Sequence, residues 1–142
     1  KSVIGCPFSL EKTDYEKPSQ NIAIYGHHLR STRSQTMFYP LHHYKNKSYY
    51  TAHNKISLET KNETRWYEIF AVFNIRESEW DVSKADFVSE AEFESFLERA
   101  ELRLFYFTGV PVDGDDHILT LITCDRDYDA EEGRLVVMAV QQ

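Results

Sequence analysis

The chain has 142 residues, of which 42% are hydrophobic, 14% aromatic and 27% charged. This is the size of one domain, and the composition excludes a disordered chain. The net charge of −7 is unevenly distributed, since residues 1–67 carry ten basic and five acidic side chains and residues 68–142 carry six and eighteen. A uniformly basic nucleic-acid binder is therefore not expected. No apolar run of about 18 residues is present, so no membrane span is predicted.

Three short elements are predicted before residue 45. They are a strand at residues 2–4, a strand at Asn21–Tyr25 and a short helix within residues 37–44. The second strand reads NIAIY and is expected to end at Gly26, because glycine interrupts regular structure. Polar segments without periodicity lie between these elements and are predicted to be loops.

The middle of the chain predicts two strands, residues 56–59 and 66–76, joined by a turn at residues 61–62. Alternation along the longer strand predicts one face made of five residues: Tyr67, Ile69, Ala71, Phe73 and Ile75. Phe70 and Val72 make its other face partly apolar as well. A strand with two apolar faces needs a cover on the second face, and a packed helix is the expected cover.

Such a helix is predicted directly after this strand. Ser89 and Glu92 have the spacing of a capping box, which marks a helix start. Four apolar residues then recur at helical spacing: Phe93, Phe96, Leu97 and Ala100. We interpret this stripe as core packing and not as a ligand surface.

The C-terminal third predicts a β-hairpin. Residues 117–124 and 134–140 are apolar runs typical of strands, and a nine-residue loop, residues 125–133, joins them. Antiparallel pairing across this loop places Cys124 opposite Arg134, at the rim of a sheet or barrel.

Cys124 and Arg134 are therefore the first candidates for chemistry. The thiolate is the reactive form of cysteine, and a neighbouring guanidinium can stabilise a thiolate or an oxyanion. The alternative interpretation is that Cys124 is a small buried apolar residue and Arg134 a surface cation. Arg126, two residues after the cysteine, is a second candidate for the arginine role.

His27 follows the strand at Asn21–Tyr25 and is a candidate for proton transfer, although a single histidine is more often structural. The pairs His27–His28 and His42–His43 lack the i, i+4 spacing of metal-binding histidines on a helix.

Other polar residues give weaker signals. Asp125 and Asp127 could orient an imidazole, but acidic loop residues are commonly solvated. Cys6 has no comparable constellation and is expected to be a bystander. Three aspartates lack the spacing of a calcium-binding loop: Asp113, Asp115 and Asp116. We expect no cofactor and no metal.

Together these segments resemble the sortase family. Residues 120–124 read TLITC and are followed ten positions later by Arg134 in RLVV, which resembles the active-site signature of that family. Residues 24–28, IYGHH, resemble its histidine motif. Residues 67–73, YEIFAVF, and residues 36–38, TMF, look like class B sortases in particular. The helix that precedes the cysteine strand is also similar to class B.

The resemblance implies a mainly β protein, a closed β-barrel with peripheral helices. It also implies a cysteine transpeptidase on the extracellular face of a Gram-positive membrane that recognises an NPxTN-like sorting motif of surface proteins. Cys124 would be the nucleophile that forms a thioacyl-enzyme, His27 the general acid and Arg134 the oxyanion-stabilising or substrate-positioning residue. The acyl group would pass to an amine of a peptidoglycan precursor or of a pilin subunit. Nucleic acid is not an expected partner.

Some points stay open at the level of sequence. His28 could exchange roles with His27, and Arg126 could replace Arg134. Class B sortases usually have an anchor, N-terminal helices and two further strands before the point where this chain begins. We therefore expect residues 1–142 to be a single, N-terminally truncated catalytic domain whose membrane anchor lies outside the chain. A pilin polymerase, a thiol hydrolase and an inert sortase-like binding module are the alternatives.

Overall fold

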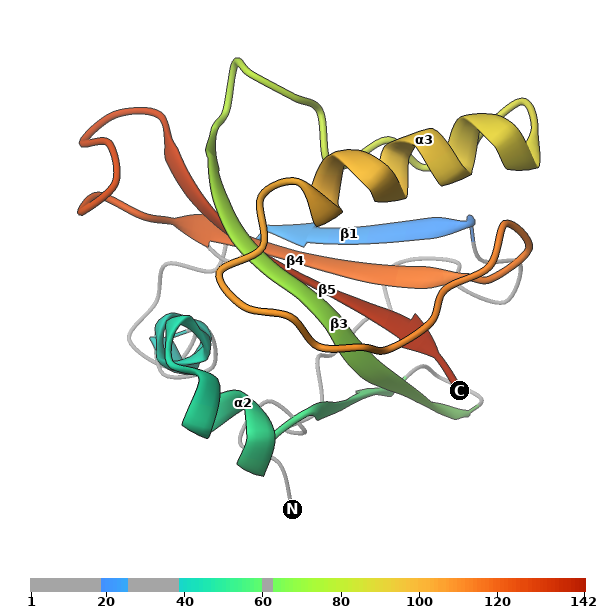
Figure 1. Ribbon diagram of the computed structural model, residues 1–142, viewed down its shortest axis with the longest axis horizontal. Coiled ribbons are helices and arrows are strands. Elements are labelled where there is room, and N and C mark those ends of the chain that lie inside the picture. Colours follow the sequence, from blue (N-terminus) through green and yellow to red (C-terminus); the bar gives the residue numbers. More distant parts are fainter. Residues whose placement is uncertain (1–18, 26–38, 60–62) are drawn as a thin grey trace.

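The computed structural model describes residues 19–25, 39–59 and 63–142. In these residues it contains five strands, two α-helices and one 3₁₀ helix (Figure 1). In chain order the elements are β1 (Asn21–Tyr25), η2 (Tyr39–Lys45), α2 (Lys47–Ala52), β2 (Lys55–Glu59), β3 (Thr64–Arg76), α3 (Glu90–Glu101), β4 (Ile118–Cys124) and β5 (Gly133–Gln141). The mainly β class predicted from the sequence is confirmed.

All five strands belong to one sheet with the order β1-β4-β5-β3-β2. β1 pairs with β4 in parallel, and the other neighbours are antiparallel. The sheet is twisted and curled, with α3 across one face and α2 on the other side (Figure 1). It thus forms part of a barrel wall, the curled arrangement that the predicted sortase fold requires.

Each face of the sheet buries its own core. On the α2 side, residues of η2 and α2, among them Leu41, Tyr44 and Tyr50, pack against apolar side chains from all five strands. On the α3 side the four apolar residues of the predicted helical stripe are all buried against the sheet. The interpretation of that stripe as core packing is confirmed, and the two-sided burial explains why β4 and β5 are almost continuously apolar.

The predicted face of β3 is wrong from Phe70 onward because the strand contains a β-bulge. Ile69 is paired with Ala139 and Ala71 with Met138, which leaves Phe70 as an extra residue. Tyr67 and Ile69 therefore face the α2 side, whereas Ala71, Phe73 and Ile75 face the α3 side. The bulge lets one long strand supply aromatic side chains to both cores.

Asn21 fixes the position of β1 at the edge of the sheet. Its buried side-chain amide donates hydrogen bonds of 2.9 Å to the carbonyl oxygens of Val82 and Lys84, and its oxygen accepts one of 2.6 Å from the Thr120 hydroxyl. Three segments far apart in the sequence are joined at one polar side chain. The edge strand is thus held by specific hydrogen bonds as well as by its pairing with β4.

Two helix starts differ in how well the sequence indicated them. Ser89 caps α3 as predicted, since its hydroxyl accepts a 3.1 Å hydrogen bond from the backbone N–H of Glu92. The helix predicted within residues 37–44 is the 3₁₀ helix η2. α2 follows it and was not predicted; Asn46 caps this helix by accepting a 2.9 Å hydrogen bond from the Ser48 N–H. The strand predicted at residues 2–4 lies outside the described residues.

No helix in the described part of the chain is both long and apolar enough to span a membrane.

Candidate active site

Cys124 and Arg134 are direct cross-strand partners at the end of the β4–β5 pair. Ile122 and Val136, two positions along each strand, belong to the core under α3, so the thiol and the guanidinium point to that same face. Both side chains are partly exposed. The predicted juxtaposition of these two residues is confirmed, and Cys124 is not a fully buried apolar residue.

The turn between β4 and β5 is compact, and Gly133 makes it possible. The backbone N–H of Asp125 donates to the Gly133 carbonyl at 2.9 Å, and the Gly133 N–H donates to the Asp129 carbonyl at 3.1 Å. A Cβ at Gly133 would lie 2.0 Å from the Asp125 carbonyl oxygen, well inside contact distance. Only glycine fits there, because the Asp125 carbonyl group packs directly against the Gly133 backbone. This close contact fixes the backbone next to Cys124 and Arg134.

The carboxylate of Asp129 organises the outer part of this turn. It accepts hydrogen bonds from the backbone N–H groups of Glu131, at 3.0 Å, and Glu132, at 2.9 Å, and from the Arg76 side chain, at 3.0 Å. The Glu132 N–H and then the Arg76 guanidinium lower the pKa of Asp129 to about 2. The turn is therefore tied to the end of β3 as well as to its own strands.

Asp125, the residue after Cys124, is completely buried and forms an ion pair with Lys45 at 2.9 Å. The expectation that the acidic loop residues are solvated is wrong for this one. Its Oδ1 accepts from the Lys45 ammonium, while Oδ2 has no hydrogen-bond partner among the described residues. The ion pair connects η2 to the backbone beside the candidate nucleophile.

His42, also on η2, is the histidine that the described residues place beside Cys124. Burial and then the Lys45 charge lower its pKa, while the charge of Asp125 and a hydrogen bond with the Cys124 backbone act in the opposite direction. The imidazole is thus kept mainly neutral near neutral pH. Its sequence signal, a histidine pair without metal-ligand spacing, gave no reason to place it here.

The Arg134 guanidinium is held along two of its edges. One Nη group donates to the Glu77 carboxylate, and the other donates to the carbonyl oxygens of Gly133, at 2.8 Å, and Glu131, at 3.4 Å. Its Nε is buried and has no partner among the residues that the structure describes. Arg126 is exposed within the turn and out of register with Cys124, so the geometry favours Arg134 for the arginine role.

The predicted general acid, His27, lies outside the described residues, as do His28 and Cys6. β1 ends at Tyr25, whose partner in the parallel pair is Ile122. This end of β1 is therefore the end of the sheet at which Cys124 lies. The catalytic roles of His27, Cys124 and Arg134 stay predictions.

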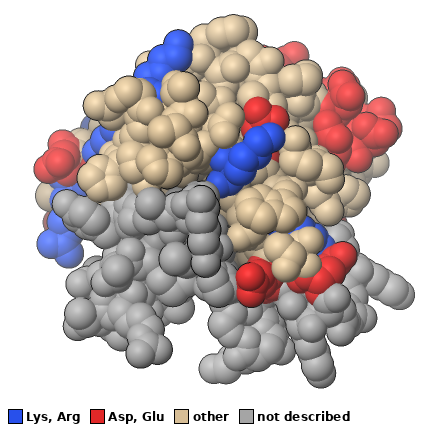
Figure 2. Space-filling view, turned by 90° about the horizontal axis from the view of Figure 1, so that it is seen from below, with Lys and Arg blue, Asp and Glu red and all other residues tan. Residues whose placement is uncertain are grey.

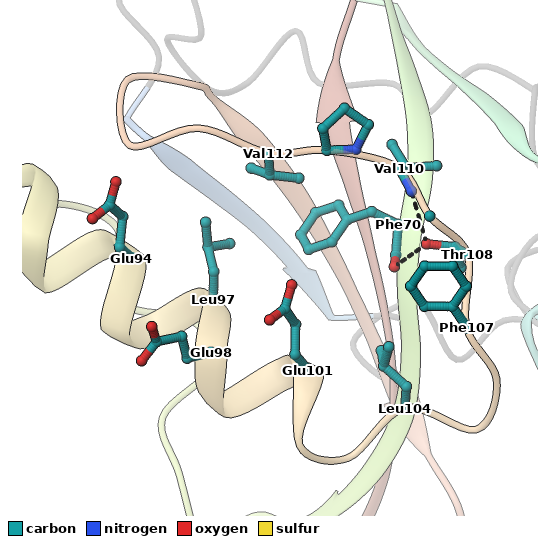
Figure 3. A pocket seen from close by; sticks show the side chains of 12 residues that line it. Phe70, Glu94, Leu97, Glu98, Glu101, Leu104, Phe107, Thr108, Val110 and Val112 are labelled. Carbon is teal, nitrogen blue, oxygen red and sulfur yellow. Dashed lines mark hydrogen bonds between the residues drawn. The ribbon is translucent and has the colours of Figure 1, made fainter.

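A separate groove of about 620 Å³ lies between α3 and residues 104–112 (Figure 3). Its floor is apolar, with Phe70 and Leu97 facing inward, and Glu98 and Glu101 stand on the helix side. Thr108 holds the opposite wall by donating a 2.8 Å hydrogen bond to the Phe70 carbonyl. Neither Cys124 nor Arg134 lines this groove.

The face of the molecule seen in Figure 2 carries charged side chains of both signs. On the face seen in Figure 2, small groups of acidic and basic side chains are scattered among uncharged residues, with no broad basic area in the described part.

The comparisons with a family model and with curated proteins point to the same family. The sortase domain model matches residues 7–142. Sortase B of Listeria monocytogenes is 31% identical over 137 residues, and sortase B of Staphylococcus aureus is 26% identical over 135 residues. These matches cover 96% and 95% of this chain and 54% of each relative. The chain thus spans about half the length of the curated relatives it matches.

The fold comparison points the same way. Sortase B of Clostridium perfringens has 29% sequence identity and a TM-score of 0.74, covering 87% of this chain and 66% of that one. The Staphylococcus aureus sortase B–substrate complex has 25% identity and a TM-score of 0.77, covering 92% and 59%. With sequence, fold and the cysteine–arginine pair in agreement, the chain belongs to the sortase family and groups with its class B members.

Proposed function

We propose that the protein is a cysteine transpeptidase that cleaves an NPxTN-like C-terminal sorting motif of surface proteins and transfers the product to a cell-wall amine. One observation carries the proposal, namely the register that places the Cys124 thiol opposite the Arg134 guanidinium. A relative solved as a sortase B–substrate complex, and another sortase B solved in complex with triglycine, support a peptide donor and an amine acceptor.

In the first half-reaction the Cys124 thiolate attacks the backbone carbonyl carbon of the motif's threonine. The C–N bond breaks, the acyl group stays on sulfur as a thioester, and the leaving amine takes a proton from His27. In the second half-reaction an acceptor amine attacks the thioester, gives one proton to the His27 imidazole that the first step left neutral, forms a new amide and releases the thiolate. Splitting one amide exchange into two acyl transfers is the advantage of a covalent intermediate.

Arg134 is suited to stabilise the oxyanion that forms during both attacks. Its side chain is only 12% exposed, and a charged donor in such a poorly solvated position interacts more strongly than one in water. The Nε group is the donor that has no partner among the described residues, whose hydrogen bonds engage only the terminal nitrogens of this side chain. Loss of one such donor typically lowers kcat by ~10²–10³-fold.

As part of the same proposal, the reaction takes place at the extracellular face of the bacterial membrane. Surface proteins and cell-wall amines are both accessible there. The support for this location is family membership alone.

The test combines two donor peptides with two acceptors. The protein is incubated with NPxTN-type and LPxTG-type peptides, with and without triglycine or a diaminopimelate-type amine, and all species are followed by mass spectrometry. We expect cleavage of the NPxTN peptide, an acyl-enzyme and a product that contains the amine.

Two cysteine variants serve as controls, and two other results would contradict the proposal. Cys124→Ala is expected to abolish the acyl-enzyme, while Cys6→Ala, the matched cysteine change, is expected to retain it. A cleaved product that never contains the acceptor amine would indicate a thiol hydrolase and not a transpeptidase. Unchanged masses of both peptides and protein would leave the inert binding module as the remaining interpretation.

A further inference from the structure

Glu77 lies directly after the end of β3 and reaches the guanidinium of Arg134. Its backbone is fixed, because its N–H donates to the Glu132 carbonyl at 2.8 Å. The next residue, Ser78, donates from both its N–H and its hydroxyl to the Glu132 side chain. The carboxylate of Glu77 is therefore presented by a backbone that the β4–β5 turn itself holds in place.

The ion pair determines how the Arg134 guanidinium is oriented. Its two terminal nitrogens are held on opposite sides, one by the Glu77 carboxylate and the other by backbone carbonyl groups. Because a guanidinium is planar, two such contacts fix the plane and with it the direction of the Nε–H bond. Without Glu77 only the contacts to the carbonyl groups remain, and these allow the plane to turn.

Stability alone does not account for this arrangement. The Glu77 side chain is 55% exposed, and ion pairs with an exposed partner contribute little to folding. A donor aimed at a developing oxyanion, in contrast, contributes far more to a rate. The pair is thus better explained by the orientation of Arg134 than by folding.

We propose that Glu77 is a positioning residue that orients the Arg134 guanidinium so that its buried Nε–H faces the reacting carbonyl. This inference rests on the proposed transpeptidase function of Cys124 and Arg134. Glu77 itself touches neither the thiol nor the substrate and acts only through the arginine.

Glu79 provides a matched control. It lies two residues further along the same segment and also pairs with an arginine, Arg103, at 2.9 Å. Its side chain is 35% exposed. An alanine substitution at Glu77 or at Glu79 therefore removes the carboxylate partner of one arginine. Of these two arginines, only Arg134 is the cross-strand partner of Cys124.

The first experiment measures steady-state kinetics with the NPxTN peptide. Glu77→Ala is expected to lower kcat on the order of tenfold, a part of the ~10²–10³-fold lost with an oxyanion donor, and to leave KM nearly unchanged. Glu77→Gln is expected to lose less, because its amide oxygen still accepts a hydrogen bond. In an Arg134→Ala background, Glu77→Ala is expected to have no further effect. Equal losses in Glu77→Ala and Glu79→Ala, or an undiminished loss in the Arg134→Ala background, would overturn the proposal.

The second experiment does not depend on activity and so separates this inference from the proposed function. The side-chain Nε–Hε signal of Arg134 is assigned by NMR through its loss in Arg134→Lys, and its solvent exchange rate is measured. Glu77→Ala is expected to accelerate exchange several-fold, whereas Glu79→Ala is not. If the wild type cleaves no peptide, the proposed function fails, but the exchange rate still tests whether Glu77 orients Arg134. An unchanged exchange rate in Glu77→Ala would refute the orienting role of Glu77.

Discussion

Asp125 and Lys45 form an ion pair across 80 residues of sequence, and the carboxylate is completely buried directly after Cys124. A buried carboxylate is costly unless a cation accompanies it. Lys45 supplies that cation from η2, and the same 3₁₀ helix brings His42 to the Cys124 backbone. The backbone beside the thiol is therefore supported by an element that lies on the other side of the sheet from α3.

The first prediction concerns this ion pair. Lys45→Met leaves the Asp125 carboxylate buried without its cation, and we expect the free energy of unfolding to fall by about 1–3 kcal/mol, below the usual loss for a fully buried pair because Lys45 is partly exposed. Urea unfolding measures the change. Lys47→Met, an exposed lysine two residues away, is the control and should change stability by less than about 0.5 kcal/mol. Similar losses in both variants would contradict the role of the pair.

The second prediction concerns Gly133. Gly133→Ala places a methyl group 2.0 Å from the Asp125 carbonyl oxygen, so the turn has to open and the Cys124–Arg134 register is disturbed. We expect a loss of at least about 2 kcal/mol in the free energy of unfolding, together with loss of peptide cleavage. Ala130→Ser, an exposed change in the same turn, should alter neither. Retention of full activity in Gly133→Ala would show that the turn tolerates a different backbone path.

The third prediction is a pH dependence that originates at His42. Since burial lowers its pKa in the folded state below the ordinary value of 6.5, the unfolded chain binds the proton more readily. The contribution of this group to stability is therefore complete above pH 6.5 and is lost as the pH falls through the folded-state pKa. Urea unfolding from about pH 8 to about pH 5 should show a smaller acid loss for His42→Gln than for the wild type. The matched change at exposed His117 should keep the wild-type profile, and identical profiles for all three proteins would exclude His42 as the cause.

The fourth prediction concerns the start of α3, the helix that covers the face of the sheet to which Cys124 points. Ser89→Ala removes the hydroxyl that accepts from the Glu92 N–H, and a lost N-cap lowers the free energy of unfolding by about 1 kcal/mol. Thermal unfolding followed by circular dichroism is the measurement. Ser95→Ala, at an exposed position inside the same helix, should be neutral or slightly stabilising because alanine favours the helix. Equal destabilisation by the two changes would show that the cap is not the cause.

Local patterns in the sequence were sufficient for most elements. NIAIY predicted β1 with its bounds, and the spacing of Ser89, Glu92 and the apolar stripe predicted α3 with its cap. The hairpin that brings Cys124 opposite Arg134 followed from two apolar runs and the length of the loop between them. These are contacts between neighbours in the chain, for which periodicity and turn chemistry carry the information.

Long-range and irregular features were not accessible in this way. The bulge at Phe70 reverses the facing of the second half of β3, but both faces of this strand are apolar, so the bulged and the regular strand fit the sequence equally well. The burial of Asp125 depends on Lys45, and the position of His42 depends on the packing of η2 against the sheet. No local pattern in a sequence relates residues 80 positions apart. The ion pair between Glu77 and Arg134 could not be predicted for the same reason.

The parallel pairing of β1 with β4 has a consequence for how the molecule is made. β1 leaves the ribosome almost a hundred residues before its partner strand, and Asn21 finds the Thr120 hydroxyl only across that separation. Arg134 and the rest of β5 emerge later still. A nascent chain that ends before residue 133 contains the thiol but lacks the arginine and the strand that fix its surroundings. The cysteine is thus assembled into its site only after β5 has been synthesised.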